Sequence, residues 1–327
     1  MDHLLRNSSV LVTGGAGFIG SNLVESLLMA GNRVTCLDNF STGTRNNLAE
    51  FLSDPGFRLV EGDIRNTDDC RKSLSGIEYV FHEAALGSVP RSIKDPVSTT
   101  DVNVGGFVKM LFAAREAGVK RFIYASSSSV YGDNADLPKA EEKTGVPLSP
   151  YAISKCADEL FASNFARLFG MEIIGLRYFN VFGRRQDPEG AYAAVIPRFI
   201  MSLLEHNPPM INGDGSYSRD FTYIDSVLQA NHLAALAENP GAINQVYNIA
   251  HGGRTTLNQL FELIRGIIGS FDNDVLEIEA IHGPDRDGDI PHSLASIEKA
   301  SRLLGYAPSV DIREGLEETL SWFQKNL

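Results

Sequence analysis

The sequence predicts an α/β fold in which a doubly wound parallel sheet is joined to a second, smaller α+β region. Short apolar, β-rich runs alternate with helical patterns through the first half of the chain, and this alternation is typical of parallel strands joined by right-handed crossovers. A glycine-rich loop joins the first run to the first helical pattern. Beyond residue 180 the helical patterns shorten and turn signals multiply, so we expect residues 1–180 and 181–327 to form separate units.

The predicted elements of the first unit follow one another in a regular order. Strands are expected at residues 9–13, 32–37, 57–60, 79–82, 121–125 and 175–181. Helical patterns lie after the glycine loop and at residues 67–74, 102–117 and 151–169. Residues 220–237 again show a strand followed by a helix, so we expect the chain to return to the first unit there.

The composition is ordinary for a globular protein, but it is acidic. Apolar residues make up 43% of the 327 residues, and 29 Lys and Arg against 41 Asp and Glu give a net charge of −12. This composition excludes disorder of the whole chain, and it disfavours binding to nucleic acids or anionic membranes, whose phosphates attract basic surfaces. A phosphate-bearing ligand would need backbone N–H groups and a few well-placed arginines.

Neither the cysteines nor the histidines are spaced as metal ligands. Cys36, Cys70 and Cys156 form no Cys-x-x-Cys pair, so free thiols and no bound metal are expected. The chain has no run of about 18 apolar residues, the length that spans a bilayer. The first nine residues carry no apolar stretch, so we expect a cytoplasmic protein with no membrane partner.

The glycine-rich loop at residues 13–20 (TGGAGFIG) indicates a nucleotide site. Gly15, Gly17 and Gly20 form a Gly-x-Gly-x-x-Gly motif, and Gly14 precedes them. Glycines in such a loop allow a tight turn and let the backbone approach a pyrophosphate at the start of the following helix. The alternative is a glycine-rich turn that binds no ligand.

Acidic residues at the next strand ends support the nucleotide interpretation. Asp38 ends the second strand, where a carboxylate accepts hydrogen bonds from ribose hydroxyls and repels a 2′-phosphate, which favours NAD over NADP. Asp63 and Ile64 follow the third strand and are expected to bracket the adenine edge. For Asp38 the alternative is a simple turn residue before Asn39.

Tyr151 and Lys155 form a candidate acid–base pair. Ser149 and Pro150 read as the N-cap and first residue of a helix, which places Tyr151 and Lys155 on one helical face. A free phenol has a pKa near ~10, but an adjacent ammonium and a positive nicotinamide ring favour the phenolate. The pair is then a general base for a hydroxyl that is oxidised to a ketone. The alternative is an amphipathic helix with a solvated lysine.

A run of four serines at residues 126–129 follows the fifth strand. Ligands bind at the carboxyl edge of such sheets, where a serine hydroxyl can hold the substrate hydroxyl. The alternative is a serine-rich loop that caps the next turn. The order of glycine loop, serine run and Tyr-x-x-x-Lys favours the functional interpretation of all three.

Together these motifs resemble the extended short-chain dehydrogenase/reductase family, and within it the nucleotide-sugar 4-epimerases, over essentially the whole chain. The resemblance rests on TGGAGFIG, Asp38-Asn39, SSSSVYGD, Tyr151 with Lys155, and RYFNVFG at residues 177–183. The segments AALGSVPRS at residues 84–92 and GRRQDP at residues 183–188 further resemble the bacterial subgroup that acts on UDP-N-acetylglucosamine and UDP-N-acetylgalactosamine. The resemblance implies an NAD-binding Rossmann domain over residues 1–180 and a UDP-sugar-binding domain over residues 181–327.

The resemblance also implies roles for individual residues. The catalytic residues are Ser127, Tyr151 and Lys155. The cofactor-binding residues are Gly14, Gly17, Phe18, Ile19, Gly20, Asp38, Asn39, Asp63, Ile64, Ala84, Ala85, Leu86, Asn103, Ser126, Tyr151, Lys155 and Tyr178. The substrate-binding residues are Gly87, Ser88, Ser127, Ser128, Asn180, Ala194, Val195, Arg219, Arg286, Asp289 and Ser293. For the arginines, the alternative is surface salt bridges, which contribute little to stability.

The reaction implied is inversion at C4 of a UDP-hexose through a transient 4-keto sugar. Tyr151, bridged by Ser127, takes the C4 hydroxyl proton while hydride passes to NAD⁺; the keto sugar rotates about its anchored diphosphate, and hydride returns to the opposite face. Ser128 and Ser129 stand where related dehydratases carry Asp-Glu and where decarboxylases carry a Glu at the second of the two positions. Serine cannot do that acid–base work, so dehydration and decarboxylation are disfavoured. The alternatives are a UDP-glucose/UDP-galactose or UDP-glucuronate 4-epimerase and, in another class, a non-catalytic NAD-binding regulator.

Two further expectations follow from the resemblance. The helical patterns at residues 102–117 and 151–169 are expected to form a four-helix bundle across a two-fold axis, giving a homodimer. Ser293 stands where epimerases confined to UDP-glucose and UDP-galactose carry a bulky tyrosine, so serine there, facing Gly87 and Ser88, leaves room for a 2-acetamido group. The alternatives are a small residue chosen for packing and a one-residue shift that places His292 in the pocket.

Overall fold

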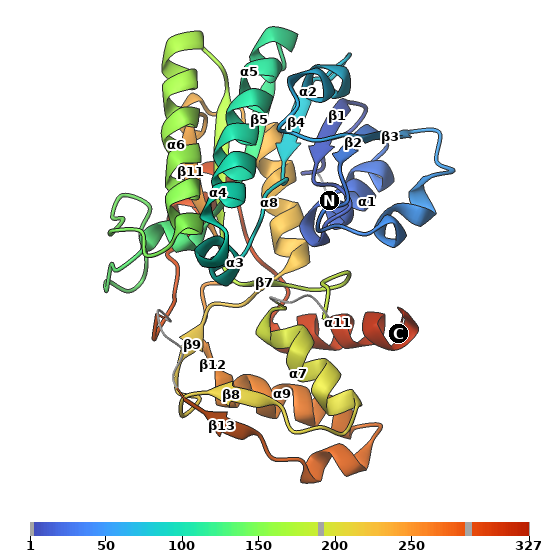
Figure 1. The fold of residues 1–327 in the computed structure, drawn as a ribbon, viewed down its shortest axis with the longest axis vertical. Coiled ribbons are helices and arrows are strands. Elements are labelled where there is room, and N and C mark those ends of the chain that lie inside the picture. Colours follow the sequence, from blue (N-terminus) through green and yellow to red (C-terminus); the bar gives the residue numbers. More distant parts are fainter. Residues whose placement is uncertain (1–2, 189–192, 285–289, 327) are drawn as a thin grey trace.

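The computed structural model describes residues 3–188, 193–284 and 290–326, and its centre is a seven-stranded parallel sheet (Figure 1). The strands of this sheet are β1 (Ser9–Thr13), β2 (Arg33–Asp38), β3 (Phe57–Glu61), β4 (Tyr79–His82), β5 (Arg121–Ser127), β6 (Ile173–Tyr178) and β11 (Gln245–Ile249). Their order is β11–β6–β5–β4–β1–β2–β3, and each neighbouring pair is parallel. The predicted doubly wound parallel sheet is therefore confirmed.

Helices cover both faces of the sheet because successive strand side chains point to opposite faces. Val10 and Val12 of β1 belong to the apolar cluster that includes the buried side chains of α1 (Phe18–Met29) and α8 (Ile224–Leu236). Leu11 belongs to the second cluster, with buried residues of α2 (Thr67–Ser73), α5 (Phe107–Ala117) and α6 (Pro150–Phe169). Figure 1 shows α5 and α6 running side by side along one side of the sheet.

The capping residues of α6 place Tyr151 in its first turn. The Ser149 hydroxyl accepts a hydrogen bond from the Ala152 N–H at 3.1 Å, and Pro150 is the first helical residue. The helix ends at Gly170, which has a φ of 66°, a conformation that glycine adopts without steric cost. The helix start predicted from Ser149 and Pro150 is confirmed.

The helix expected at residues 102–117 is interrupted. Its first part is a π-helical segment, η2 (Asp101–Gly106), which leads directly into α5. Gly106 packs against Ile64, and a Cβ at that glycine would lie 2.6 Å from Ile64 Cδ1. Single π-helical turns are frequent at functional sites, and this one presents Asn103 to the backbone of Leu86.

The strand β6 ends earlier than expected, and β11, the remaining strand of the large sheet, was not predicted. Asn180 has a φ of 35°, so the chain leaves the sheet there and then forms β7 (Val181–Phe182), which pairs with β10 (Thr222–Tyr223). The strand β11 contains Asn248, which is buried and accepts a hydrogen bond from Tyr131 Oη at 2.6 Å. Because β11 is short and contains this polar residue, it lacks the continuous apolar run by which the other strands were predicted.

Most of the remaining elements form the smaller region seen below the sheet in Figure 1, and the others connect the strands of the sheet. Its larger helices are α7 (Val195–Leu204), α9 (Leu257–Gly269) and α11 (Ile312–Asn326). Its short strand pairs are β8 (Met210–Asn212) with β13 (Ile281–Gly283), and β9 (Ser218–Arg219) with β12 (Thr255–Thr256). The other helical segments are η1 (Arg45–Phe51), α3 (Val89–Lys94), α4 (Pro96–Thr100), η3 (Ser128–Tyr131), η4 (Pro240–Ala242), η5 (Asn273–Glu277) and α10 (Glu298–Leu304).

The apolar core runs without interruption from the sheet into this region. Phe199 and Leu203 of α7, Phe261 of α9 and Phe323 of α11 belong to the same buried cluster as Val12 of β1. The α8 helix, within the residues where the chain was expected to return, packs against β5 and β6. None of the described helices is long and apolar enough to cross a membrane.

Candidate active site

The glycine loop after β1 lies against the chain that follows β4. Gly14 has a φ of 69°, and a Cβ there would lie 2.7 Å from Ala84 Cα. At Gly20, within α1, a Cβ would lie 2.1 Å from the Gly14 carbonyl oxygen. No side chain caps the N-terminus of α1 at Gly17, and its first turn carries no acidic residue. The unpaired N–H groups and the helix dipole therefore favour an anion there.

Asp38 at the end of β2 supports the glycine loop and lines the cavity beside it. Its carboxylate accepts hydrogen bonds from Ala16 N–H and Phe40 N–H, each at 2.8 Å. Burial raises the pKa of Asp38, and these N–H groups oppose the rise. A carboxylate has about four acceptor positions, so Asp38 keeps capacity for ligand hydroxyls in addition to its two backbone bonds.

Asp63, after β3, forms a polar cluster with its neighbours at the same edge. Asn39 Nδ2 donates to Asp63 Oδ2 at 2.8 Å, and Arg65 Nη2 donates to the same oxygen at 2.7 Å. The Arg65 hydrogen bond is the largest cause that lowers the pKa of Asp63 to about 2. Asp63 is thus a permanent carboxylate, held by an exposed arginine.

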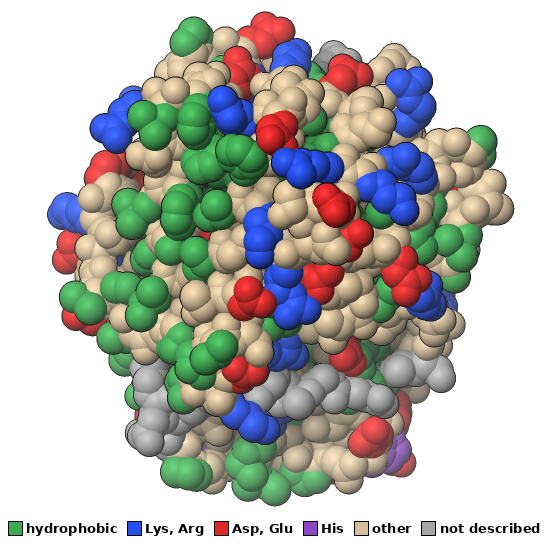
Figure 2. Space-filling view, turned by 45° about the horizontal axis from the view of Figure 1, so that its top comes forward, with side chains coloured by type: hydrophobic (Ala, Val, Ile, Leu, Met, Phe, Trp, Pro, Cys, Tyr) green, Lys and Arg blue, Asp and Glu red, His purple; other side chains and the backbone are tan. Residues whose placement is uncertain are grey.

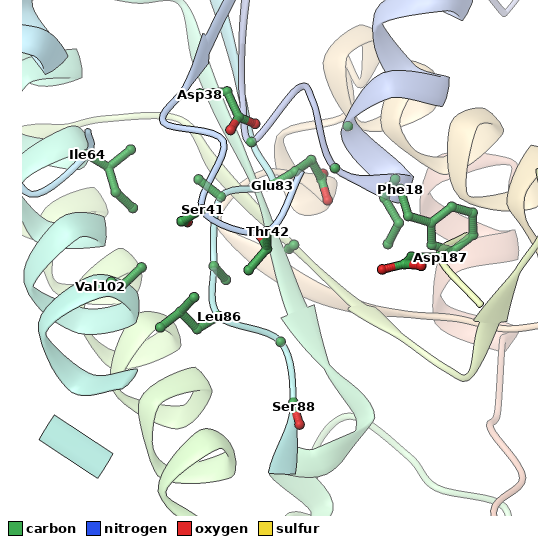
Figure 3. Close-up of a pocket in the computed structure, with 18 of the residues that line it drawn as sticks. Phe18, Asp38, Ser41, Thr42, Ile64, Glu83, Leu86, Ser88, Val102 and Asp187 are labelled. Carbon is green, nitrogen blue, oxygen red and sulfur yellow. The ribbon is translucent and has the colours of Figure 1, made fainter. Parts of the chain in front are cut away.

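A cavity of about 560 Å³ lies where the strand order reverses, at the carboxyl ends of the strands. This is the position at which open α/β sheets bind ligands. Figure 3 shows Asp38, Glu83, Leu86 and Phe18 around it. Its lining combines the glycine loop with the ends of β2, β4 and β5 and with the first turns of α6.

Ser127, Tyr151 and Lys155 all line this cavity. Ser127 accepts hydrogen bonds from the N–H and the hydroxyl of Ser129, at 3.2 and 3.0 Å. Lys155 is buried, and its Nζ donates to Ala125 O at 2.9 Å. Although burial opposes the charge, Asp158, Tyr151 and Glu83 raise the pKa of Lys155, so it is an ammonium beside the tyrosine.

Glu83 is a buried acid in the same cavity that the sequence analysis missed. It directly follows β4, as Asp38 and Asp63 stand at the ends of their strands, and that position was the signal that could have found it. The Tyr178 hydroxyl donates to Glu83 Oε1 at 2.9 Å and accepts from Asn231 Nδ2 at 2.9 Å. Burial raises the pKa of Glu83 to about 7, although Tyr178 and Lys155 lower it.

Ser126 belongs to an ion-pair network behind the cavity. Its hydroxyl donates to Glu159 Oε1 at 2.6 Å, and Arg177 donates to both oxygens of Glu159 at 2.8 Å. This bidentate pair is mostly buried and ties α6 to β6, so it fixes the helix that carries Tyr151.

A second cavity, of about 940 Å³, adjoins the first. Both cavities are lined by Gly87, Ser88, Asn180, Val181 and Gln186. The second is also lined by α7 and by the cations Arg198 and Arg219. Arg219 donates to Ser218 O at 3.0 Å. The two cavities therefore share one wall, and Tyr151 and Lys155 line the first of them.

Most of the predicted site residues line one of these cavities. In the first cavity are Gly14, Gly17, Phe18, Ile19, Gly20, Asp38, Asn39, Asp63, Ile64, Ala84, Ala85, Leu86, Ser126, Ser127, Tyr151, Lys155 and Tyr178. In the second are Ala194, Val195 and Arg219, while Gly87, Ser88 and Asn180 are shared. Further lining residues that were not predicted include Ser41, Thr42, Asn47, Glu83, Arg185 and Gln186.

A few predicted residues lie elsewhere. Asn103 is buried behind the wall, where it accepts a hydrogen bond from Leu86 N–H at 2.8 Å and positions the lining instead of forming it. Ser128 lies in η3, outside both linings, and Ser293 donates its N–H to Ser218 O at 3.0 Å without lining either cavity. Arg286 and Asp289 lie outside the described residues.

Comparisons with known proteins agree with this geometry. Residues 10–250 match the model of the NAD dependent epimerase/dehydratase family. A putative UDP-glucose 4-epimerase from Methanocaldococcus jannaschii is 38% identical, with 97% of this chain and 99% of the relative covered. Among solved structures, a UDP-N-acetylglucosamine 4-epimerase from Methanobrevibacter ruminantium in complex with UDP-N-acetylmuramic acid is 38% identical, with a TM-score of 0.92 and coverage of 99% and 100%. A UDP-glucose 4-epimerase from Thermotoga maritima with UDP-glucose is also 38% identical, with a TM-score of 0.90 and coverage of 97% and 99%.

Two helical glycines give opposite predictions for substitution by alanine. Gly20→Ala places a methyl group against the Gly14 carbonyl, so it should destabilise the fold by about 1–3 kcal/mol and abolish cofactor binding. Gly266→Ala in α9 is the control, because no atom lies within 4 Å of its Cβ position, and it should stabilise by about 0.5–1 kcal/mol. Denaturant unfolding and calorimetric NAD titration measure both. If the Gly20→Ala protein binds NAD like the parent, the glycine loop is not the site that binds the cofactor.

Proposed function

The chain belongs to the NAD dependent epimerase/dehydratase family and is an NAD-dependent UDP-sugar 4-epimerase, and we propose that UDP-N-acetylglucosamine and UDP-N-acetylgalactosamine are its preferred substrates. One observation carries the proposal: a cavity that contains a tyrosine–lysine pair opens, through small wall residues, into a second cavity with arginines. The first cavity suits NAD and the second suits a UDP-sugar, so the reacting carbon lies at their junction.

The residues of the first cavity fit NAD. The start of α1 has no side-chain cap, so its N–H groups could bind the diphosphate. The close packing at Gly14 and Gly20 holds the loop in place beside it. Asp38 would accept the ribose hydroxyls. When bound, NAD⁺ supplies the acceptor of the C4 hydride and later its donor, so no net oxidation occurs.

Three side chains handle the proton. Tyr151 takes the proton of the sugar C4 hydroxyl and returns it at the end, so the tyrosine acts first as base and then as acid. Ser127, at the end of β5, orients that hydroxyl. The Lys155 ammonium favours the phenolate form of Tyr151 by its positive charge.

The second cavity anchors the nucleotide and leaves the sugar free to turn. Arg219, with Arg198 on the wall, offsets the charge of the diphosphate in a chain whose net charge is −12. Asn180 lies at the boundary of the two cavities, where it would bond the sugar–diphosphate link. Rotation of the keto sugar about this link presents its opposite face, and hydride return then inverts C4.

The preference for N-acetylated sugars rests on the small residues around the sugar. Gly87 and Ser88 form the wall shared by the two cavities. Ser293 lines neither cavity, but its N–H donates to Ser218 O beside Arg219 of the second cavity. We therefore propose that a larger side chain at residue 293 would extend toward the sugar. The similarity to a UDP-N-acetylglucosamine 4-epimerase supports this preference, while the equal identity to a UDP-glucose 4-epimerase makes UDP-glucose the second candidate.

We also propose that the chain forms a homodimer through α5 and α6. Figure 2 shows hydrophobic side chains gathered on the left of that view, the side on which Figure 1 places α6 and α5. Exposed apolar residues of these helices are Phe112, Ile153, Leu160, Phe161, Leu168 and Phe169. A contiguous apolar face of this kind is typical of a protein–protein interface, and two helices from each of two chains form a four-helix bundle.

Tyr151→Phe removes the ionisable oxygen and keeps the ring. General base catalysis contributes about 10²–10⁴-fold, so we expect a loss of turnover of at least that size, measured with each UDP-sugar. Circular dichroism checks the fold. Turnover within a few-fold of the parent would show that Tyr151 is not the base, and NAD binding without any epimerisation by the parent would favour the regulator alternative.

Ser293→Tyr tests the substrate preference. The added ring should fill the space of the 2-acetamido group and abolish turnover of UDP-N-acetylglucosamine, while UDP-glucose and UDP-galactose are spared. The measurement is the ratio of kcat/KM for the two sugar types in variant and parent. An unchanged ratio would remove Ser293 as the determinant of pocket size.

Leu160→Asp places a charge in the centre of the proposed interface, since this side chain of α6 is 72% exposed. We expect the mass in solution, measured by light scattering after gel filtration, to fall from dimer to monomer. Met29→Asp is the matched control, because Met29 is 82% exposed and ends α1 on the other side of the sheet. A monomeric parent contradicts the proposal.

A further inference from the structure

Asp158 faces the Lys155 ammonium from one turn further along α6. Lys155 Nζ lies 3.3 Å from Asp158 Oδ2 and donates to Ala125 O at 2.9 Å. The side chains of Lys155 and Asp158 are 4% and 1% exposed. An ammonium has three N–H groups. Two of them are therefore directed at the protein, and one is left for the cavity that Lys155 lines.

The hydrogen bonds of Asp158 differ from those of a structural buried acid. Asp220, for comparison, accepts backbone N–H groups of His251, Gly252 and Ala295. Asp158 Oδ2 has Lys155 as its partner, and no donor among the described residues reaches Oδ1. Burying a carboxylate without strong hydrogen-bond partners costs free energy. Lys155 is the partner that Asp158 has, so we infer that Asp158 is placed there to pair with Lys155.

The other ionisable groups around Lys155 and Asp158 are either neutral or bonded to other partners. His82, at the end of β4, is neutral because burial and the charge of Lys155 lower its pKa to about 3. Tyr124 of β5 is neutral because burial raises its pKa well above the usual value. Glu159 is paired with Arg177. Glu83 lies in the same cavity but hydrogen-bonds Tyr178. Asp158 is therefore the counter-ion in contact with Lys155.

We propose that Asp158 is a positioning residue for the epimerase reaction: its carboxylate holds the Lys155 ammonium in place and offsets part of the positive charge that Lys155 exerts on Tyr151. The inference rests on the proposed role of Tyr151 as the base. Asp158 lines neither cavity, so we infer that it acts on the reaction through its contact with Lys155.

The charge that faces the Lys155 ammonium should affect how the reaction depends on pH. A less-balanced ammonium favours the phenolate more strongly, so removal of the Asp158 charge moves the acid limb of kcat/KM to lower pH. Burial raises the pKa of Asp158 to about 7, although Lys155 lowers it.

Asp158→Asn keeps the size and polarity of the side chain and removes its charge. In the NAD-loaded enzyme we expect the acid limb to move down by on the order of one pH unit. The absorbance of tyrosinate near ~295 nm, taken as the difference from the same protein carrying Tyr151→Phe, should shift in the same direction. Asp68→Asn is the matched control, because Asp68 is exposed, and its profile should stay at the parent position.

A limb that stays in place in Asp158→Asn, whatever happens to kcat, overturns the proposal. A stability comparison decides the case in which that variant does not fold. At alkaline pH, Lys155→Met leaves a lone buried carboxylate, whereas Lys155→Met with Asp158→Asn removes both charges. The double variant should melt at a higher temperature than the single one, and the reverse order overturns the pairing. Activity retained by Tyr151→Phe would instead refute the assigned base without affecting this comparison.

Discussion

The close approach between the chain after β1 and the chain after β4 is the constraint on which the site depends. Gly14 lies so near Ala84 that a Cβ would meet its backbone at 2.7 Å, and Thr13 Oγ1 lies 2.9 Å from His82 Nδ1. Because the strand order reverses at this pair, the connections diverge to opposite faces and leave a crevice between them. The start of α1, Asp38 and the walls of the first cavity all open into that crevice.

An acidic protein that binds an anionic ligand must arrange its few positive charges locally. The chain carries a net charge of −12, yet the start of α1 has no acidic residue in its first turn, and Arg198 and Arg219 line the second cavity. Asp63 lines the first cavity as well, but Arg65 and Asn39 hold its carboxylate. The carboxylate of Asp63 is thus held by its own partners and not left facing the ligand alone.

Several buried ionisable groups lie in or directly beside the first cavity. Lys155 lies close to Asp158 and in the same cavity wall as Glu83, and burial raises the pKa of both acids to about 7. Behind them, Arg177 and Glu159 form a pair that fixes α6. Such burial costs stability and is typical of sites that tune proton affinity. The rigid strand ends of β4 and β5 make this arrangement possible.

The sequence alone determined the alternation of strands and helices, the glycine loop and the capped start of α6, because periodicity, Gly and Ser-Pro act within a few residues of the chain. Most of the lining residues came instead from the resemblance to the extended short-chain dehydrogenase/reductase family. It did not show β11, whose polar Asn248 is buried through partners more than 100 residues away, nor the end of β6, which depends on the φ of Asn180. Asp158 is unremarkable in the sequence, and Glu83 is marked there only by its position directly after β4. Only the tertiary structure, which buries them beside Lys155, decided their significance, because a carboxylate acquires an unusual proton affinity from its surroundings and not from its neighbours in the chain.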